Sequence, residues 1–236
     1  MSILGDLFAL FVPDVCPVCG RPKQEGEGVF CVACQWDMPL TGYQDVADNP
    51  VAEKLWGLAD VRNACAVMFF EHEGGLRDAV HGFKYGSRWT VARELGLWMG
   101  RLLASSPLYG SVDTVVPVPL HPLRLLARGY NQSELLAEGV AQGMNAELCT
   151  SALRRVRHND SQTGMHGNER WDNVEGIFSV RWPQRLSGRH VLIVDDVFTT
   201  GATVCSCAEA IRHACGDCRI SVATLAVSRS QAGIRD

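Results

Sequence analysis

The sequence predicts an α/β protein in which helices flank a parallel sheet, with a small metal-organised unit at the N-terminus. From about residue 61, strand patterns alternate with helix patterns, an order typical of parallel sheets covered on both faces. Before that point, glycines and prolines punctuate four cysteines within residues 14–36. A chain of 236 residues is long enough for one substantial core and a small appendage. We therefore expect a zinc-finger domain with its connector over residues 1–60 and an α/β domain over residues 61–236.

The expected elements follow from apolar periodicity and from capping signals. Strands are expected at residues 64–70, 113–118, 190–194 and 219–227, and helices at residues 3–11, 76–84, 91–103, 131–143 and 202–213. Residues 37–60 are an acidic connector with helical potential around Val51–Leu58. The stretch Arg154–Arg170 lacks apolar periodicity and contains two glycines, so we expect a mobile loop there.

Charge is distributed unevenly along this chain of net charge −4. Residues 1–60 hold 9 acids and 3 bases, whereas residues 76–170 hold 11 bases and 8 acids, and all but one of those bases are arginines. Arginine suits bidentate phosphate contacts, although on charge alone a solvated arginine-rich surface is the favoured interpretation. The overall acidity excludes a strong electrostatic attraction to nucleic acid, so any such contact has to be local.

The location expected from the sequence is the cytoplasm. The longest apolar run near the start, Leu7–Val12, is too short to span a bilayer, and no basic residue precedes it. We therefore expect neither a signal peptide nor membrane insertion. In a reducing compartment the ten cysteines are metal ligands or buried thiols, and not disulfides.

The most specific pattern is the segment Val191–Thr203. Its buried strand ends at Asp195 and Asp196, at the sheet edge where α/β proteins bind ligands. A turn of threonines and Gly201 follows and opens the next helix, whose N-terminus favours an anion. Carboxylates for two ribose hydroxyls beside a phosphate-binding turn suit a ribose 5-phosphate. A Mg²⁺ site made by the two acids alone is the competing interpretation, but it does not account for the turn.

A second segment has the right chemistry for a diphosphate. A strand at Val115–Val118 enters a proline-stiffened turn, which places Arg124 and Arg128 near the start of the helix expected after Asn131. Guanidinium groups beside a helix N-terminus hold phosphates well.

Four cysteines have the spacing of a metal knuckle, C-x₂-C-x₁₁-C-x₂-C. Two sulfurs separated by two residues can reach one ion, and four thiolates make a closed structural zinc site. A redox-active C-x-x-C is the alternative, which two such pairs so close together disfavour. The expected zinc ligands are Cys16, Cys19, Cys31 and Cys34. The remaining cysteines are expected to be small buried apolar residues: Cys65, Cys149, Cys205, Cys207, Cys215 and Cys218.

Taken together, these segments resemble a known family. Val191–Thr203 resembles the motif with which type I phosphoribosyltransferases bind 5-phosphoribosyl 1-diphosphate (PRPP), and the chain from the knuckle to the last strand resembles the ComF (ComFC/GntX) family. The resemblance implies a type I phosphoribosyltransferase fold, a double zinc-ribbon-like finger, structural Zn²⁺, and Mg²⁺ bound with PRPP. It also implies a role in DNA uptake (competence) or DNA utilisation.

The resemblance assigns the PRPP contacts residue by residue. It implies that the acid pair binds the ribose, that the turn binds the 5-phosphate, and that the two arginines bind the diphosphate. It also includes a lysine–tyrosine pair among the PRPP-binding residues. The residues are Asp195, Asp196, Val197, Thr199, Thr200, Gly201, Ala202, Thr203, Arg124, Arg128, Lys84 and Tyr85. Orotate-type relatives carry a catalytic lysine in the mobile loop, which Arg154–Arg170 lacks. No catalytic residue is therefore assigned.

Three functions stay open at this stage. The first is a PRPP-binding protein of DNA uptake or utilisation that transfers a phosphoribosyl group and releases diphosphate. The second is a non-catalytic adaptor that senses PRPP or a nucleotide and binds single-stranded DNA or a competence helicase. The third is a nucleobase-salvage transferase, for which no base-reading signature is visible.

Overall fold

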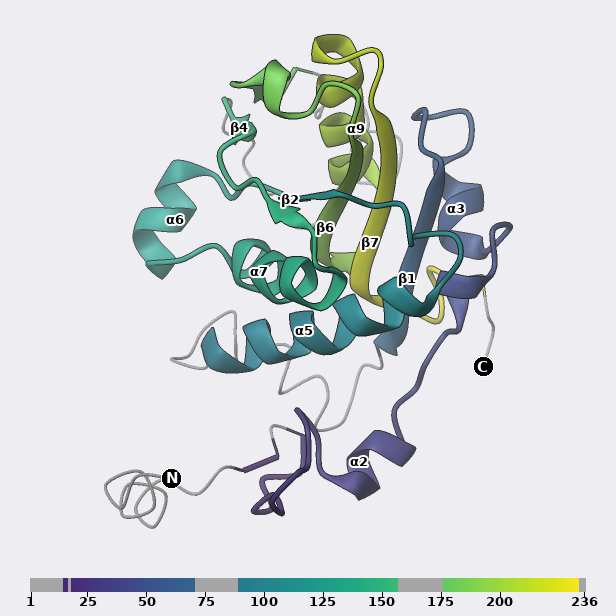
Figure 1. Ribbon diagram of the computed structural model, residues 1–236, viewed down its shortest axis with the longest axis vertical. Helices are drawn as coiled ribbons and strands as arrows, with labels where there is room; N and C mark the ends of the chain where they lie inside the picture. Colours follow the sequence, from purple (N-terminus) through teal and green to yellow (C-terminus); the bar gives the residue numbers. More distant parts are fainter. Residues whose placement is uncertain (1–14, 17, 71–88, 157–175, 234–236) are drawn as a thin grey trace.

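A five-stranded parallel sheet lies at the centre of the computed structural model, which describes residues 15–16, 18–70, 89–156 and 176–233 (Figure 1). Its strand order is β1-β7-β6-β2-β3. The strands are β1 (Asn63–Phe70), β2 (Thr114–Pro117), β3 (Glu147–Leu148), β6 (His190–Phe198) and β7 (Arg219–Ser228). A separate antiparallel pair joins β4 (Leu153–Arg155) to β5 (Phe178–Val180). The four predicted strands are confirmed, and β6 runs four residues beyond its expected end.

Helices cover both faces of this sheet (Figure 1). They are α2 (Val32–Trp36), α3 (Pro50–Leu55), α5 (Trp89–Ser105), α6 (Pro122–Arg128), α7 (Gln132–Met144) and α9 (Ala202–Ala214), with 3-10 turns η1 (Tyr43–Asp45) and η2 (Pro183–Arg185). The helices expected at residues 91–103, 131–143 and 202–213 are confirmed. Those expected at residues 3–11 and 76–84 lie outside the described residues. In the described part of the chain, no helix is long and apolar enough to cross a membrane.

The two faces of β6 explain its unbroken apolar run. Val191 and Ile193 join the core cluster that contains α3 and α9, while Leu192 and Val194 join the cluster that contains α5 and α7. A strand buried on both sides needs apolar residues at every position, which is why parallel strands lack polar alternation.

Helices α5 and α7 cross at glycines, and this brings their backbones into contact. A Cβ atom built on Gly139 would lie 2.0 Å from the carbonyl oxygen of Arg93, and one on Gly96 would lie 2.1 Å from that of Leu136. Gly100 and Gly143 are equally closed to a side chain, with nearest backbone atoms at 2.5 and 2.7 Å. The close crossing holds α7 against the sheet next to β2 and β6.

The expected acidic connector contributes to the α/β core from Pro39 onward. The backbone N–H of Thr41 donates to the carbonyl of Val67 at 3.1 Å, so this segment pairs briefly with β1. Asn49 caps α3, and its side-chain amide also donates to the carbonyl of Ala64 in β1 at 2.7 Å. Residues 39–55 therefore pack on the sheet. The domain boundary near residue 60 stays a prediction.

Two segments differ from expectation. Arg154 and Arg155, expected in the mobile loop, pair with β5 as part of β4, because a three-residue strand is too short for periodicity to reveal. The mobility expected for residues 157–170 concerns residues outside the described ranges.

The segment after β2 also differs from expectation. The sequence predicts a turn there, and the structure has helix α6, with Pro122 in its first turn and Gly129 (φ 82°) at its end. That pair of residues is a helix signature that the charge-based interpretation of the segment overlooked.

Buried His190, at the start of β6, makes the stability of the fold sensitive to pH. Its ring nitrogens lie 2.8 Å from the hydroxyl of Ser111 and 2.9 Å from that of Ser221. Burial lowers the pKa of His190, as do the positive charges of Arg219 and Arg62. The unfolded chain therefore takes up this proton at a higher pH than the folded chain.

We expect the contribution of His190 to stability to be complete above about pH 6.5 and to fall as the pH drops below it. The slope cannot exceed about 1.4 kcal/mol per pH unit for one proton. Urea unfolding at pH 7.5 and 5.5 measures it, and His190→Gln should reduce the loss at the lower pH. The control His213→Gln, at an exposed site, should keep the wild-type loss; equal losses in wild type and His190→Gln would contradict the assignment.

Candidate functional site

The two predicted ligand-binding segments meet at one edge of the sheet. Strands β2 and β6 are parallel, so α6 and α7, which follow β2, start at the same edge as the turn that follows β6. The hydroxyl of Ser133 on α7 donates to Oδ1 of Asp195 at 2.8 Å. This bond joins residues 62 positions apart in the sequence. The sequence alone does not indicate this contact of Ser133, which is a product of the fold.

Asp195 and Asp196 are held in fixed orientations by backbone donors. The N–H of Asp196 donates to Oδ1 of Asp195 at 3.0 Å, and the N–H of Val197 donates to Oδ1 of Asp196 at 2.7 Å. Asp195 is half-buried and Asp196 is 7% exposed. Both acids lie within β6, whose pairing with β7 continues past them to Phe198, whereas the sequence predicts that the strand ends at the two acids. Rigid carboxylates at a strand end can accept hydrogen bonds from a diol with little loss of side-chain entropy.

The turn after β6 leads directly into the N-terminus of α9. Thr199 is exposed, while Thr200 and Thr203 are half-buried and Ala202 is buried. Gly201 is the N-cap residue, in the left-handed region with φ 83°. A Cβ atom there would lie 2.8 Å from the side chain of Leu55 and 3.0 Å from that of Phe198, so it would displace them, and the positive φ itself favours glycine. Because a glycine cap has no side chain, the first N–H groups of α9 can receive an anion.

The predicted arginines lie on α6, which is tied to the end of β2. Arg124 and Arg128 are both half-buried. Arg128 donates to the side-chain oxygen of Gln132 at 2.9 Å. Asn131 caps α7 by accepting from the N–H of Ser133 at 3.2 Å, and donates to the carbonyl of Val118 at 3.1 Å. Lys84 and Tyr85 lie outside the described residues, so their predicted place stays a prediction.

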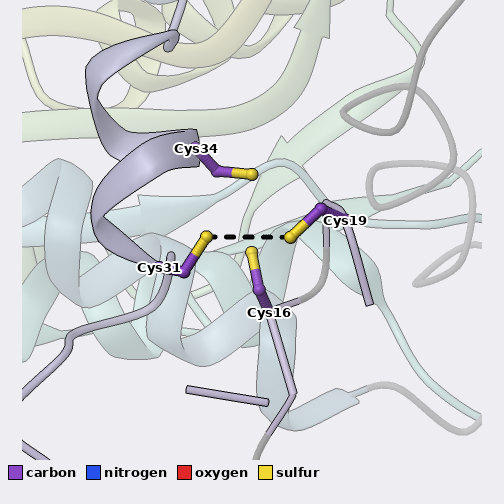
Figure 2. A group of neighbouring side chains, drawn as sticks. All are labelled: Cys16, Cys19, Cys31 and Cys34. Atoms are coloured by element: carbon purple, nitrogen blue, oxygen red, sulfur yellow. Dashed lines mark hydrogen bonds between the residues drawn. The ribbon is translucent and has the colours of Figure 1, made fainter. Parts of the chain in front are cut away.

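The four knuckle cysteines gather in one cluster (Figure 2). Their sulfur atoms all lie within 4.8 Å of one another, and those of Cys19 and Cys31 are 3.7 Å apart. Cys31 and Cys34 come from the start of α2, and Cys16 and Cys19 from the turn before it. The cluster can hold a metal ion with four ligands. Two separate redox pairs would not require all four sulfur atoms to lie together.

Electrostatics at this cluster also suit a cation. The backbone N–H and the guanidinium of Arg21 lower the pKa of Cys19 to about 6. Burial and then the three neighbouring thiols raise the pKa of Cys34 above its usual range. Thiols crowded in this way resist joint ionisation until a positive charge joins them. The remaining cysteines are buried and free, as expected.

The knuckle rests on the long helix of the α/β domain. The rings of Phe30 and Trp98 of α5 meet edge to face, with centroids 5.9 Å apart. Cys16, Phe30 and Cys31 belong to the same buried cluster as the residues between α5, α7 and the sheet. A metal in the knuckle would therefore stabilise the packing of this N-terminal unit against α5.

Comparison with known proteins assigns the chain to a family. Residues 131–235 match the phosphoribosyl transferase domain. The DNA utilization protein YhgH of Salmonella typhimurium (strain LT2) is 33% identical over 198 residues, which are 83% of this chain and 76% of that protein. This chain belongs to the ComF family. The YhgH protein of Escherichia coli (strain K12) is 27% identical over 224 residues, 85% of this chain and 91% of that protein.

Another relative is named for competence. Competence protein F of Haemophilus influenzae (strain KW20) is 32% identical over 101 residues, 42% of this chain and 44% of that protein. Among solved structures, an allosteric regulatory enzyme of purine biosynthesis is 19% identical with a TM-score of 0.39, over 61% of this chain and 30% of that chain. A score this low adds nothing to the assignment. The domain match and the parallel sheet identify the fold as the type I phosphoribosyltransferase-like α/β fold.

Proposed function

We propose that this ComF protein binds Mg²⁺–PRPP at the edge formed by the ends of β6 and β2. The observation that carries the proposal is the placement of Asp195 and Asp196 immediately before a threonine–glycine turn and the N-terminus of α9. The acids accept hydrogen bonds from the two ribose hydroxyls, and the turn with the first N–H groups of α9 binds the 5-phosphate. Arg124 and Arg128 bind the diphosphate from α6. When bound, Mg²⁺ neutralises part of the charge of that diphosphate.

If the protein is an enzyme, it transfers the phosphoribosyl group to a nucleophile. The bond between ribose C1 and the diphosphate oxygen breaks, a bond from C1 to the nucleophile forms, and diphosphate leaves with both bonding electrons. Diphosphate is a good leaving group, so the contribution of the protein is positioning and electrostatic stabilisation. The described residues include no lysine beside the acid pair, and we assign no catalytic acid or base.

The relatives named for DNA utilisation and competence support a role in DNA uptake or use. An adaptor that binds PRPP and single-stranded DNA or a helicase fits the same candidate site and the arginines of residues 76–170. Binding of DNA by those arginines would weaken steeply with salt, because each phosphate contact releases counterions. A salvage enzyme would instead transfer to a free base without binding DNA.

The deciding experiment is isothermal titration of the purified full chain with Mg²⁺–PRPP, followed by a diphosphate-release assay. We expect saturable binding of PRPP that weakens when Mg²⁺ is chelated. Release of diphosphate that depends on an added acceptor identifies an enzyme, whereas PRPP binding with salt-dependent DNA binding and no release identifies an adaptor. Absence of PRPP binding at millimolar ligand would refute the proposed function.

We also propose that the cysteine cluster holds a structural zinc ion. Elemental analysis of the purified protein should find about one zinc per chain, and Cys34→Ser should lose it and melt at a lower temperature. The control Cys149→Ala changes a buried cysteine outside the cluster and should keep the metal. If the wild type is prepared without chelators and is fully folded but contains no zinc, the proposal of a structural zinc site is refuted.

A further inference from the structure

Arg155 of β4 is an inward-facing arginine that sequence analysis did not include among the site residues. It is directly opposite Phe178 in the β4–β5 pair, and its guanidinium carbon lies 5.7 Å from the centre of that ring. Side chains alternate along a strand, so Arg155 shares the buried side of the hairpin with Leu153, while Arg154 points the other way. The burial agrees, since Leu153 is 3% exposed and Arg154 is exposed.

The hydrogen bonding of Arg155 is incomplete within the part of the chain that the structure describes. Its Nε atom is buried and has no hydrogen-bond partner among the described residues. None of the ion pairs described within residues 15–70, 89–156 and 176–233 includes it. Arg155 as a whole is half-buried, and a buried N–H without an acceptor costs free energy that a ligand carrying the acceptor would restore.

The charge of Arg155 interacts with groups from both halves of the candidate site. Burial lowers the pKa of Arg155, and the positive charge of Arg124 on α6 lowers it further. On the other side, the pKa of the buried Cys207 thiol of α9 is raised by burial and by Asp195, while the charge of Arg155 opposes this. Two arginines that repel each other near one sheet edge are stabilised together by a multiply charged anion.

We propose that Arg155 binds the diphosphate of PRPP together with Arg124, so that it determines the preference for a diphosphate over a monophosphate ligand. This rests on the function proposed above and adds a residue to that site. Phe178 supports the role, because a cation–π contact with its ring restrains the guanidinium on the buried side of the hairpin. Arg155 is thus a ligand-specificity residue at the base of the segment expected to be a mobile loop.

The test compares Arg155→Met with Arg154→Met. Methionine keeps an unbranched apolar stem for packing on Phe178 and removes the donors. We expect Arg155→Met to weaken Mg²⁺–PRPP and Mg²⁺–diphosphate binding roughly 10- to 100-fold, and ribose 5-phosphate binding by less than about 3-fold. Arg154→Met should bind all three ligands as wild type does, and Arg155→Lys should fall between the wild type and Arg155→Met.

The outcomes separate this inference from the proposed function. If the wild type does not bind PRPP, both the proposed function and the role of Arg155 are refuted. If the wild type and Arg155→Met bind PRPP equally well, only the role of Arg155 is refuted. Equal losses for PRPP and ribose 5-phosphate, with a lower melting temperature, would make Arg155 a structural residue and overturn the inference.

A second measurement uses the wild type, in case the variants do not fold. Modification of arginines by phenylglyoxal, followed by peptide mass spectrometry, reports the accessibility of each guanidinium. Mg²⁺–PRPP and Mg²⁺–diphosphate should slow modification of Arg155, while ribose 5-phosphate should not. Equal modification of Arg155 with and without saturating Mg²⁺–PRPP would contradict the contact.

Discussion

Replacing both Asp195 and Asp196 by asparagine is expected to lower the affinity for Mg²⁺–PRPP at least about 100-fold. Each carboxylate is proposed to accept a hydrogen bond from a ribose hydroxyl, and hydrogen bonds to charged groups contribute about 1.5–3 kcal/mol each. The amide keeps the shape of the carboxylate and one oxygen acceptor. The bonds that Asp195 accepts from Ser133 and Asp196 accepts from Val197 can therefore persist.

The measurement is isothermal titration of the double variant beside a matched control. Asp217→Asn removes one acid at an exposed position, where Asp217 accepts from Ser187 near the start of β7. That control should bind PRPP like the wild type, and both variants should melt within a few degrees of it. Affinity of the double variant within about threefold of wild type would remove the two carboxylates from the ribose site.

Replacing Gly139 by alanine is expected to destabilise the fold by about 3 kcal/mol or more. The new Cβ would lie 2.0 Å from the carbonyl oxygen of Arg93 and 2.5 Å from the backbone nitrogen of Leu97. Both neighbours belong to the backbone of α5, so the helices have to separate, and overpacking of this kind costs about 1–3 kcal/mol or more. In an open helix the same change would gain about 1 kcal/mol through helix propensity.

Thermal unfolding monitored by circular dichroism measures the effect. A loss of 3 kcal/mol in a chain of this size lowers the melting temperature by roughly 6–12 °C. Gly110→Ala is the matched control, because its Cβ would meet only one atom, at 3.6 Å, and its φ is ordinary. A Gly139→Ala protein as stable as this control would show that α5 and α7 do not cross as closely as described.

The crossing of α5 and α7 also matters for the candidate site. Ser133, in the first turn of α7, reaches Asp195 only because α7 lies directly against the sheet. Separation of the two helices would move this hydroxyl away from the carboxylate. We therefore expect Gly139→Ala to weaken PRPP binding as well, in the fraction that remains folded.

The local features of this protein were determined by the sequence. The unbroken apolar run of β6 predicts a strand buried on both faces, and the alternation of strands and helices predicts the parallel sheet. The threonine–glycine turn predicts the N-terminus of α9, and the cysteine spacing predicts the cluster, because each depends on residues within a few positions of one another. Helix α6 was predictable too, from Pro122 and Gly129, but it was interpreted as a turn.

Only the tertiary structure decided which of these features meet. The contact between Ser133 and Asp195, the electrostatic interaction of Arg155 with Arg124, and the packing of residues 39–55 on β1 all join segments far apart in the sequence. The glycines of α5 and α7 carry no signal in the helical pattern of the sequence, and their role is visible only where the two backbones lie in contact. Strand order and helix crossing depend on how all the apolar faces pack together at once, and no single segment contains that information.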